Sequence, residues 1–185
     1  MKKTTLYIFL VIFFCTNAFT ESRDRNTELD ELFNQLKKSK NASIAFEIEA
    51  KIWNIWSTHP TQKKLTDSLE IGSNLMSWGE LESAYQIFSR IIDSAPEWSE
   101  GWNRRATVLY LMGKYTDSLS DIDEVLKREN RHFGALSGQA LIQIGLKNYE
   151  QAINSYKTAQ SIYPFIRAAD IMIPQLQELI NNEAI

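Results

Sequence analysis

Apolar and small residues recur with a period of 34 along the central part of the chain. Each unit holds two segments of roughly 14 residues in which apolar positions follow the three-to-four spacing of a helix, separated by a short break. The pattern predicts three helical hairpins over residues 65–98, 99–132 and 133–166. The positions that repeat are Ala84, Ser118 and Ala152; Phe88, Ile122 and Tyr156; Ile91, Val125 and Ala159; Gly72, Ala106 and Ala140; and Pro96, Asn130 and Pro164.

The residue types at these positions have a physical explanation. Small residues let two antiparallel helices approach closely, and the large residues four positions further along fill the space between neighbouring pairs. Gly79 and Gly113 stand at the breaks, where glycine accepts a left-handed backbone without a Cβ penalty. In the third unit the glycine is displaced to Gly145, and Lys147 and Asn148 occupy the break.

The units resemble tetratricopeptide repeats (TPRs), which share the 34-residue period and an A-x3-F…P pattern. Ala84, Phe88 and Pro96 match that pattern, Tyr156 takes the aromatic position of the third unit, and Trp102 holds the tryptophan position of the second. The resemblance implies an all-α, right-handed α-solenoid of antiparallel helix pairs. The chain is also similar to exported TPR proteins of Gram-negative bacteria, relatives that imply no established activity.

Helical patterns continue on both sides of the repeats. Within the N-terminal segment 19–64, residues 27–57 carry two apolar stripes, with Asn41 as a candidate N-cap between them. We expect a helical hairpin stacked on the first repeat, because the stripes are too short for a free coiled coil. Residues 167–185 predict a capping helix that Pro174 kinks or splits; arrays of this kind need a terminal helix to cover the last core face.

The first 18 residues have the pattern of a signal peptide. Lys2 and Lys3 precede the apolar run 6–15, and the most plausible cleavage follows Ala18. This predicts a periplasmic or secreted protein. Two alternatives stay open: a retained membrane anchor, and a lipoprotein modified at Cys15 despite the phenylalanine before it.

Composition argues against several functions. The chain has 185 residues, a formal net charge of −3, one cysteine and two histidines. Such a charge lacks the basic excess of nucleic-acid binders, and the thiol and imidazole counts leave little for a disulfide framework or a metal. No phosphate loop or hydrolase motif appears, so we expect no enzyme, cofactor or metal. His132 is either an inter-repeat residue that caps a helix or, with Arg131, part of an anion site; the acidic residues Asp117, Asp121, Asp123 and Glu124 are expected to form a solvated face.

The resemblance implies a concave groove lined by the first helix of each pair. The implied lining positions are Thr66, Leu69, Ser73 and Met76; Glu100, Asn103, Thr107 and Tyr110; and Gly134, Ser137, Leu141 and Ile144. From these and the adjacent Arg104 we select as candidate peptide-binding residues Ser73, Asn103, Arg104, Thr107, Tyr110, Ser137 and Leu141. Only Asn103 resembles the family's carboxylate clamp. Met76, Tyr110, Leu141 and Ile144 could equally be core beneath a terminal helix, and the five tryptophans are expected to be mostly core.

The leading hypothesis is a non-enzymatic interaction module that binds a peptide or helix of another cell-envelope protein in this groove. The alternative is a self-associating or membrane-tethered structural subunit, with membrane contact only if the signal is retained. The oligomeric state and the partner's identity stay open.

Overall fold

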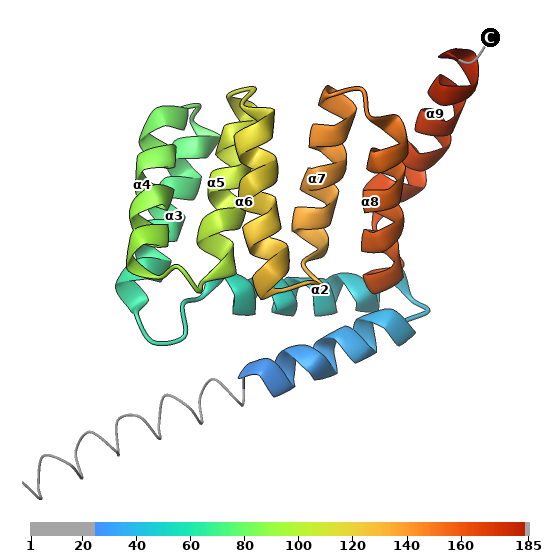
Figure 1. The fold of residues 1–185 in the computed structure, drawn as a ribbon. Coiled ribbons are helices and arrows are strands. Elements are labelled where there is room, and N and C mark those ends of the chain that lie inside the picture. Colours follow the sequence, from blue (N-terminus) through green and yellow to red (C-terminus); the bar gives the residue numbers. More distant parts are fainter. Residues whose placement is uncertain (1–24, 184–185) are drawn as a thin grey trace, which may run out of the picture.

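The computed structural model describes residues 25–183, and this part of the chain is helical without strands (Figure 1). The predicted signal peptide lies outside the described residues. An N-terminal helix covers residues 25–38 and is followed by eight labelled helices. These are α2 (Ala42–Ser57), α3 (Lys63–Ser77), α4 (Leu81–Ser94), α5 (Ser99–Leu111), α6 (Tyr115–Arg128), α7 (Phe133–Gly145), α8 (Tyr149–Ile162) and α9 (Arg167–Glu183).

The pairs α3/α4, α5/α6 and α7/α8 stand side by side as antiparallel hairpins, so the all-α solenoid is confirmed (Figure 1). Ala84, Ser118 and Ala152 are fully buried, and Ser118 satisfies its hydroxyl by donating to the Ala106 carbonyl at 2.7 Å. The residues at two further positions of the period are buried as well: Phe88, Ile122 and Tyr156, and Ile91, Val125 and Ala159. The period therefore marks the core that joins each hairpin to the next.

The breaks between paired helices have the expected left-handed backbone. Gly79 has φ 81° and Gly113 has φ 73°, while the third unit places Lys147 at φ 61°. A Cβ at Gly72 would lie 2.6 Å from the Phe88 ring, which explains the small residue there. Lys147 pays a steric cost that the two glycines avoid.

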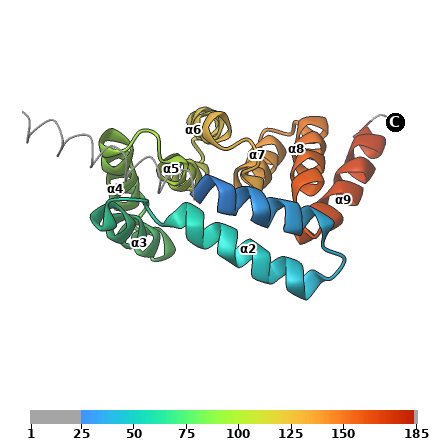
Figure 2. The same ribbon diagram turned by 90° about the horizontal axis from the view of Figure 1, so that it is seen from below.

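The N-terminal helix and α2 are together called the hairpin (residues 25–57). The prediction that this hairpin stacks on the first repeat is wrong. Figures 1 and 2 show the hairpin running lengthwise along the array, beneath the lower ends of the repeat helices. Its apolar residues share a core with Phe133, Leu136, Tyr163 and Ile166 of the third unit and the segment after it. A 16-residue helix such as α2 spans about 24 Å, enough to run past several packed helices. The apolar stripes of the hairpin therefore pack against the third unit and the helix after it.

Asn41 caps α2 as predicted, since its Oδ1 accepts from the backbone N–H groups of Ser43 and Ile44. At the other end of the chain α9 covers α8, with Ala169 and Leu176 buried. Pro174 lies inside α9 without splitting the helix. Within residues 25–183, no helix combines the length and hydropathy that crossing a membrane requires.

Candidate groove

The first helices of the second and third pairs enclose a cavity of about 230 Å³. Five of the seven predicted residues line it: Asn103, Thr107, Tyr110, Ser137 and Leu141. Gly138 and Ile142 on α7, and Ser118 and Ile122 on α6, form much of the remaining wall. Five residues that were selected from the sequence are therefore neighbours in the fold although they lie far apart in the chain. Their role in binding stays a prediction.

A larger cavity of about 680 Å³ adjoins the first. It lies between α2, the start of α7 and the segment leading into α9, and it shares Gly134 and Ser137 with the smaller cavity. The aromatic side chains around it come from α2, from the start of α7 and from the segment that leads into α9: Phe46, Trp53, Phe133, Tyr163 and Phe165. The two cavities therefore adjoin along α7 and are together called the groove, and α2 supplies a wall that the repeat pattern does not predict.

Polar side chains in the groove are largely occupied within the protein. Thr107 and Ser137 donate their hydroxyls to the carbonyls of Asn103 and Phe133 in their own helices, at 3.0 and 2.8 Å. In the larger cavity, Glu49 accepts from the Tyr163 hydroxyl at 2.9 Å and from the Trp53 indole N–H at 3.3 Å. The groove consequently offers mainly apolar and aromatic surface to a ligand.

Large apolar side chains are exposed along this groove. Phe46 on α2 is 67% exposed and Leu141 on α7 is 40% exposed. Burying such a side chain is worth about 1.5–3 kcal/mol, so both can act as contact residues for another molecule. The proposal that Leu141 is core beneath a terminal helix is therefore wrong for this residue.

Two predicted residues do not line either cavity. Ser73 lies on α3 and donates its hydroxyl to the Leu69 carbonyl at 2.8 Å. Arg104 points its guanidinium to Glu100, with 2.7 Å between Nε and Oε1. Glu100 and Leu69, expected in the groove lining, are buried instead.

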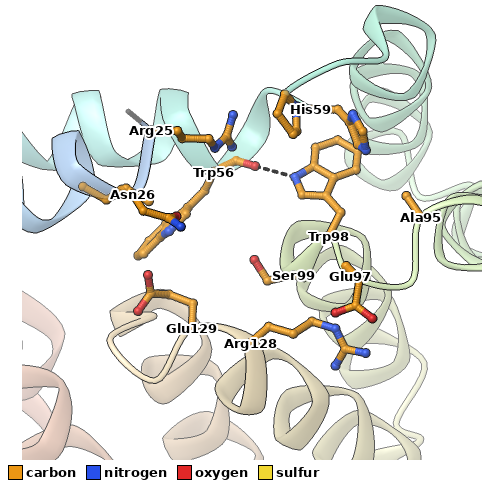
Figure 3. A pocket seen from close by; sticks show the side chains of 12 residues that line it. Arg25, Asn26, Trp56, His59, Ala95, Glu97, Trp98, Ser99, Arg128 and Glu129 are labelled. Carbon is orange, nitrogen blue, oxygen red and sulfur yellow. Dashed lines mark hydrogen bonds between the residues drawn. The ribbon is translucent and has the colours of Figure 1, made fainter. Parts of the chain in front are cut away.

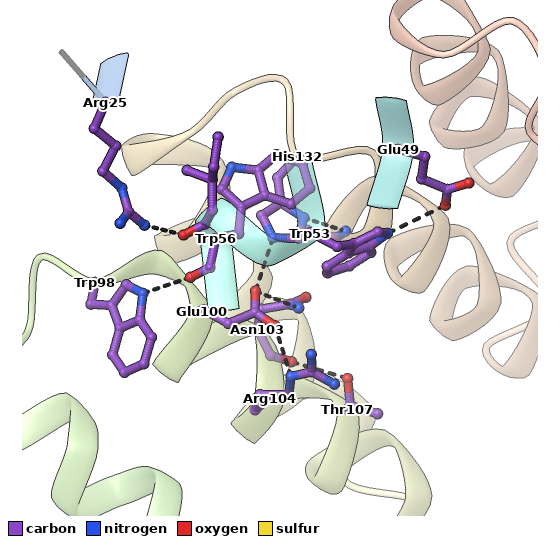
Figure 4. A network of polar contacts seen from close by, with 12 residues as sticks. Arg25, Glu49, Trp53, Trp56, Trp98, Glu100, Asn103, Arg104, Thr107 and His132 are labelled. Carbon is purple, nitrogen blue, oxygen red and sulfur yellow. Dashed lines mark hydrogen bonds and ion pairs between the residues drawn. The ribbon is translucent and has the colours of Figure 1, made fainter. Parts of the chain in front are cut away.

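Glu100 is the centre of a buried polar network between the second repeat and the hairpin (Figure 4). Its Oε2 accepts from the Asn103 amide at 3.1 Å and lies 3.2 Å from His132 Nε2. His132 Nδ1 accepts from the Ala135 backbone N–H at 3.0 Å, which confirms the interpretation that it caps a helix. Because Nδ1 is an acceptor, the imidazole proton lies on Nε2, which donates to Glu100.

Aromatic rings from α2 enclose this histidine. The Trp56 ring stacks on the imidazole with centroids 4.0 Å apart, and Trp53 meets it edge-on at 5.5 Å. A Cβ on Gly134 would lie 2.5 Å from Trp53, so this glycine permits the close approach of α2. Burial pushes the pKa of Glu100 upward, but the His132 hydrogen bond and the Arg104 charge outweigh it and hold that pKa below its ordinary value. His132 thus has a structural role, because it joins α2 to the repeats, and we call this role a clasp. Arg131 forms ion pairs with Glu129 and Asp30 and does not share an anion site with His132.

A third cavity, of about 310 Å³, lies between the hairpin and the segment that precedes α5 (Figure 3). The Trp98 indole N–H donates to the Trp56 carbonyl at 2.8 Å across it, and Arg25 donates to the Ile55 carbonyl. His59 lies beside Trp98, with ring centroids 5.1 Å apart. The Trp98 hydrogen bond ties α2 to the junction of the first two repeats, whereas the Arg25 hydrogen bond joins the two helices of the hairpin.

One sequence expectation about individual residues is wrong, and one tryptophan is the exception to the expectation that these residues are mostly core. Asp121 is buried rather than solvated, because both of its oxygens accept from Arg105 at 2.8 Å. Trp78 is 73% exposed and does not belong to the core. No group of three or more potential metal ligands occurs in the part of the chain that the structure describes.

Phe46, Glu49 and Phe165 are groove residues that sequence reasoning missed. Phe46 and Glu49 lie outside the 34-residue units, so the period carries no signal for them, and Phe165 has no apolar counterpart at the equivalent positions Glu97 and Arg131. The side chains of Phe46 and Glu49 reach the groove because the hairpin folds back beneath the third repeat.

The arrangement of helix pairs with a groove on one face is that of a helical repeat scaffold. A family model described as tetratricopeptide repeat matches residues 135–165. A TPR repeat-containing protein of Rhizobium etli is 33% identical over 174 residues, which cover 88% of this chain and 81% of that protein. The chain belongs to the tetratricopeptide repeat family.

Solved structures of low sequence identity share the fold. The first TPR domain of Spaghetti (RPAP3), bound to the HSP90 peptide SRMEEVD, superposes with a TM-score of 0.61 at 17% identity, covering 64% of this chain and 94% of that one. The Yersinia enterocolitica type III secretion chaperone SycD, in complex with a peptide of the translocator YopD, gives 0.56 at 11% identity, covering 66% and 93%. Both cover about two thirds of the present chain.

Proposed function

We propose that the protein is a non-enzymatic interaction module of the bacterial envelope that binds a segment of another protein in the groove between α2, α5 and α7. The observation that carries this proposal is that two adjoining cavities share Gly134 and Ser137 in their linings, with exposed apolar side chains beside them. A groove with apolar walls and few free polar groups suits a peptide or helix that inserts apolar side chains.

The expected ligand differs from the acidic peptide named for the Spaghetti complex. Asn103, the one residue that resembles a carboxylate clamp, gives its amide to Glu100, and Arg104 is paired with the same carboxylate. Glu49 and Asp170 lie around the larger cavity, and Arg167 is the one basic residue there among the described residues. An acidic C-terminal segment would therefore meet little positive charge.

Site-specific photo-crosslinking in cells tests the proposal. A photo-reactive residue at Leu141 should capture a partner from the envelope, whereas one at the exposed Thr158, on the second helix of the third pair, should not. The Phe46→Ser variant, probed from the same position, should reduce capture because it removes an exposed apolar contact without disturbing the core. Equal capture from both positions, or capture unaffected by the Phe46 change, would refute the groove as the binding site.

Cell fractionation tests the location independently. The mature protein should be found in the periplasm and should lack residues 1–18 by mass measurement. A cytoplasmic protein that retains Met1 would contradict the envelope assignment without bearing on the groove.

A further inference from the structure

The outer face of α3 is a repeat-packing face that is exposed in this structure. The residues equivalent to Asp67 and Asn74 in the next two repeats are Gly101 and Val108, then Ala135 and Ile142. All four of these are buried, and Gly101 lies against Ile91 and Ile92 of the preceding repeat. The fold therefore uses this side of the first helix of a pair to bind the helices that come before it.

On α3 the same side carries apolar side chains that are exposed to solvent. Ile71 is 53% exposed and Trp78 is 73% exposed, with the partly buried Leu75 between them. Spaced by four and three residues, the three side chains form one stripe. Beside it a cleft of about 410 Å³ between α3 and α4 has both apolar and basic lining, including Leu65, Ile87, Lys64 and Arg90. The hairpin does not cover this end, because it lies beneath the repeats (Figures 1 and 2).

We propose that this face binds α3 of a second copy of the chain, with the two helices antiparallel about a two-fold axis through Ile71. A two-fold interface is isologous, so the same surface must complement itself. In this register Ile71 meets Ile71 of the partner subunit, and residues equally spaced on either side of it pair with one another. Lys64 then lies against the partner subunit's Trp78, and Ser68 against the partner subunit's Asn74.

The charges of α3 favour an antiparallel copy as the occupant. Its first turn contains Lys63 and Lys64 and no acidic residue, and its last turn contains no basic residue. This distribution is unfavourable for the dipole of a single helix, whose N-terminus is positive and whose C-terminus is negative. An antiparallel partner reduces this effect, because Lys64 of each copy lies beside the negative C-terminal end of the other, while Lys63 keeps its ion pair with Asp67 in its own helix. An ammonium group over the Trp78 ring adds a cation–π contact.

Light scattering during gel filtration, over a series of protein concentrations, measures the predicted assembly. We expect the mass of a dimer at the upper concentrations. Trp78→Ser should raise the dissociation constant by about thirtyfold, as expected for an interfacial tryptophan. Leu111→Ser, which removes an exposed apolar residue from α5, serves as the matched control and should leave the dimer intact. A chain that is monomeric throughout, or a dimer indifferent to Trp78→Ser, overturns the proposal.

A single cysteine tests the two-fold axis. In a Cys15→Ser background, Ile71→Cys should form a disulfide-linked dimer under mild oxidation, because a residue on the axis meets its own copy within disulfide reach. Glu70→Cys, exposed on the same helix but turned about 100° from the axis, should not. If Trp78→Ser dissociates the assembly while Ile71→Cys fails to crosslink, no two-fold axis passes through Ile71 and the proposed arrangement is wrong. Equal crosslinking at both positions also overturns it.

Discussion

His132 joins the hairpin to the repeats, and its replacement by alanine should lower the free energy of unfolding substantially. Three contributions are lost: the stacking of the imidazole on Trp56, the hydrogen bond to buried Glu100, and the helix cap at Ala135. Typical values are about 0.5–1.5 kcal/mol for the aromatic pair, about 1–3 kcal/mol for a buried group deprived of its partner, and about 1 kcal/mol for the cap. Together they predict a loss of about 4 kcal/mol.

Urea unfolding followed by tryptophan fluorescence measures this loss, because Trp53 and Trp56 both contact the imidazole. His132→Gln, which can still donate to Glu100, should cost less than His132→Ala. His59→Ala is the matched control: His59 Nδ1 accepts from the backbone N–H groups of Thr61 and Gln62, a local contact worth about 1 kcal/mol. A His132→Ala loss no larger than that of His59→Ala would refute the role of His132 as a clasp.

Three further substitutions test separate parts of the structure. The pKa of Glu100 is depressed from its ordinary value of 4.5, so its stabilising contribution is present above that pH and is lost as the pH falls through the lower folded value. Below about pH 4.5 the urea midpoint should therefore drop more steeply in the wild type than in Glu100→Gln. Lys147→Gly should raise stability by about 1 kcal/mol in thermal unfolding, because it relieves a left-handed backbone at φ 61°, and an unchanged or lower melting temperature would count against this. Gly134→Ala should cost about 1–3 kcal/mol because its Cβ would overlap Trp53, whereas Gly138→Ala, with its nearest neighbour at 3.5 Å, should be neutral or stabilising; equal effects would disprove the packing argument.

The repeat core could be predicted because each of its positions obeys the same packing requirement three times. Ala84 and Phe88 have equivalents in every unit, and all of them are buried. The substitution of Ser118 at a small position does not break the pattern, since its hydroxyl finds the Ala106 carbonyl within the same hairpin. The spacing of residues along the chain was sufficient to predict the buried positions wherever their contacts were local or repeated.

The position of the hairpin could not be predicted in this way. The stripes in residues 27–57 predicted its helices and the cap at Asn41, but a stripe does not say which surface it covers. Its partners Phe133 and Tyr163 lie about 80 and 110 residues further along the chain, and Glu100 becomes buried only because α2 covers it. The assignment of Glu100 to the groove failed for that reason.

The residues that line the groove could be predicted only in part, because the sequence does not show which surface the hairpin covers. Tyr110 and Leu141 follow from their repeat positions, whereas Phe46 and Glu49 reach the groove from an element with no period. Placing α2 under the third repeat has two consequences: it adds an aromatic wall to the groove, and it leaves the outer face of α3 exposed at Ile71 and Trp78. The position of α2 therefore creates two separate surfaces on the array, the groove and the outer face of α3. Phe46→Ser should weaken partner capture without changing the oligomeric state, and Trp78→Ser should change the oligomeric state without affecting capture. If either substitution altered both properties, the two surfaces would be coupled rather than separate.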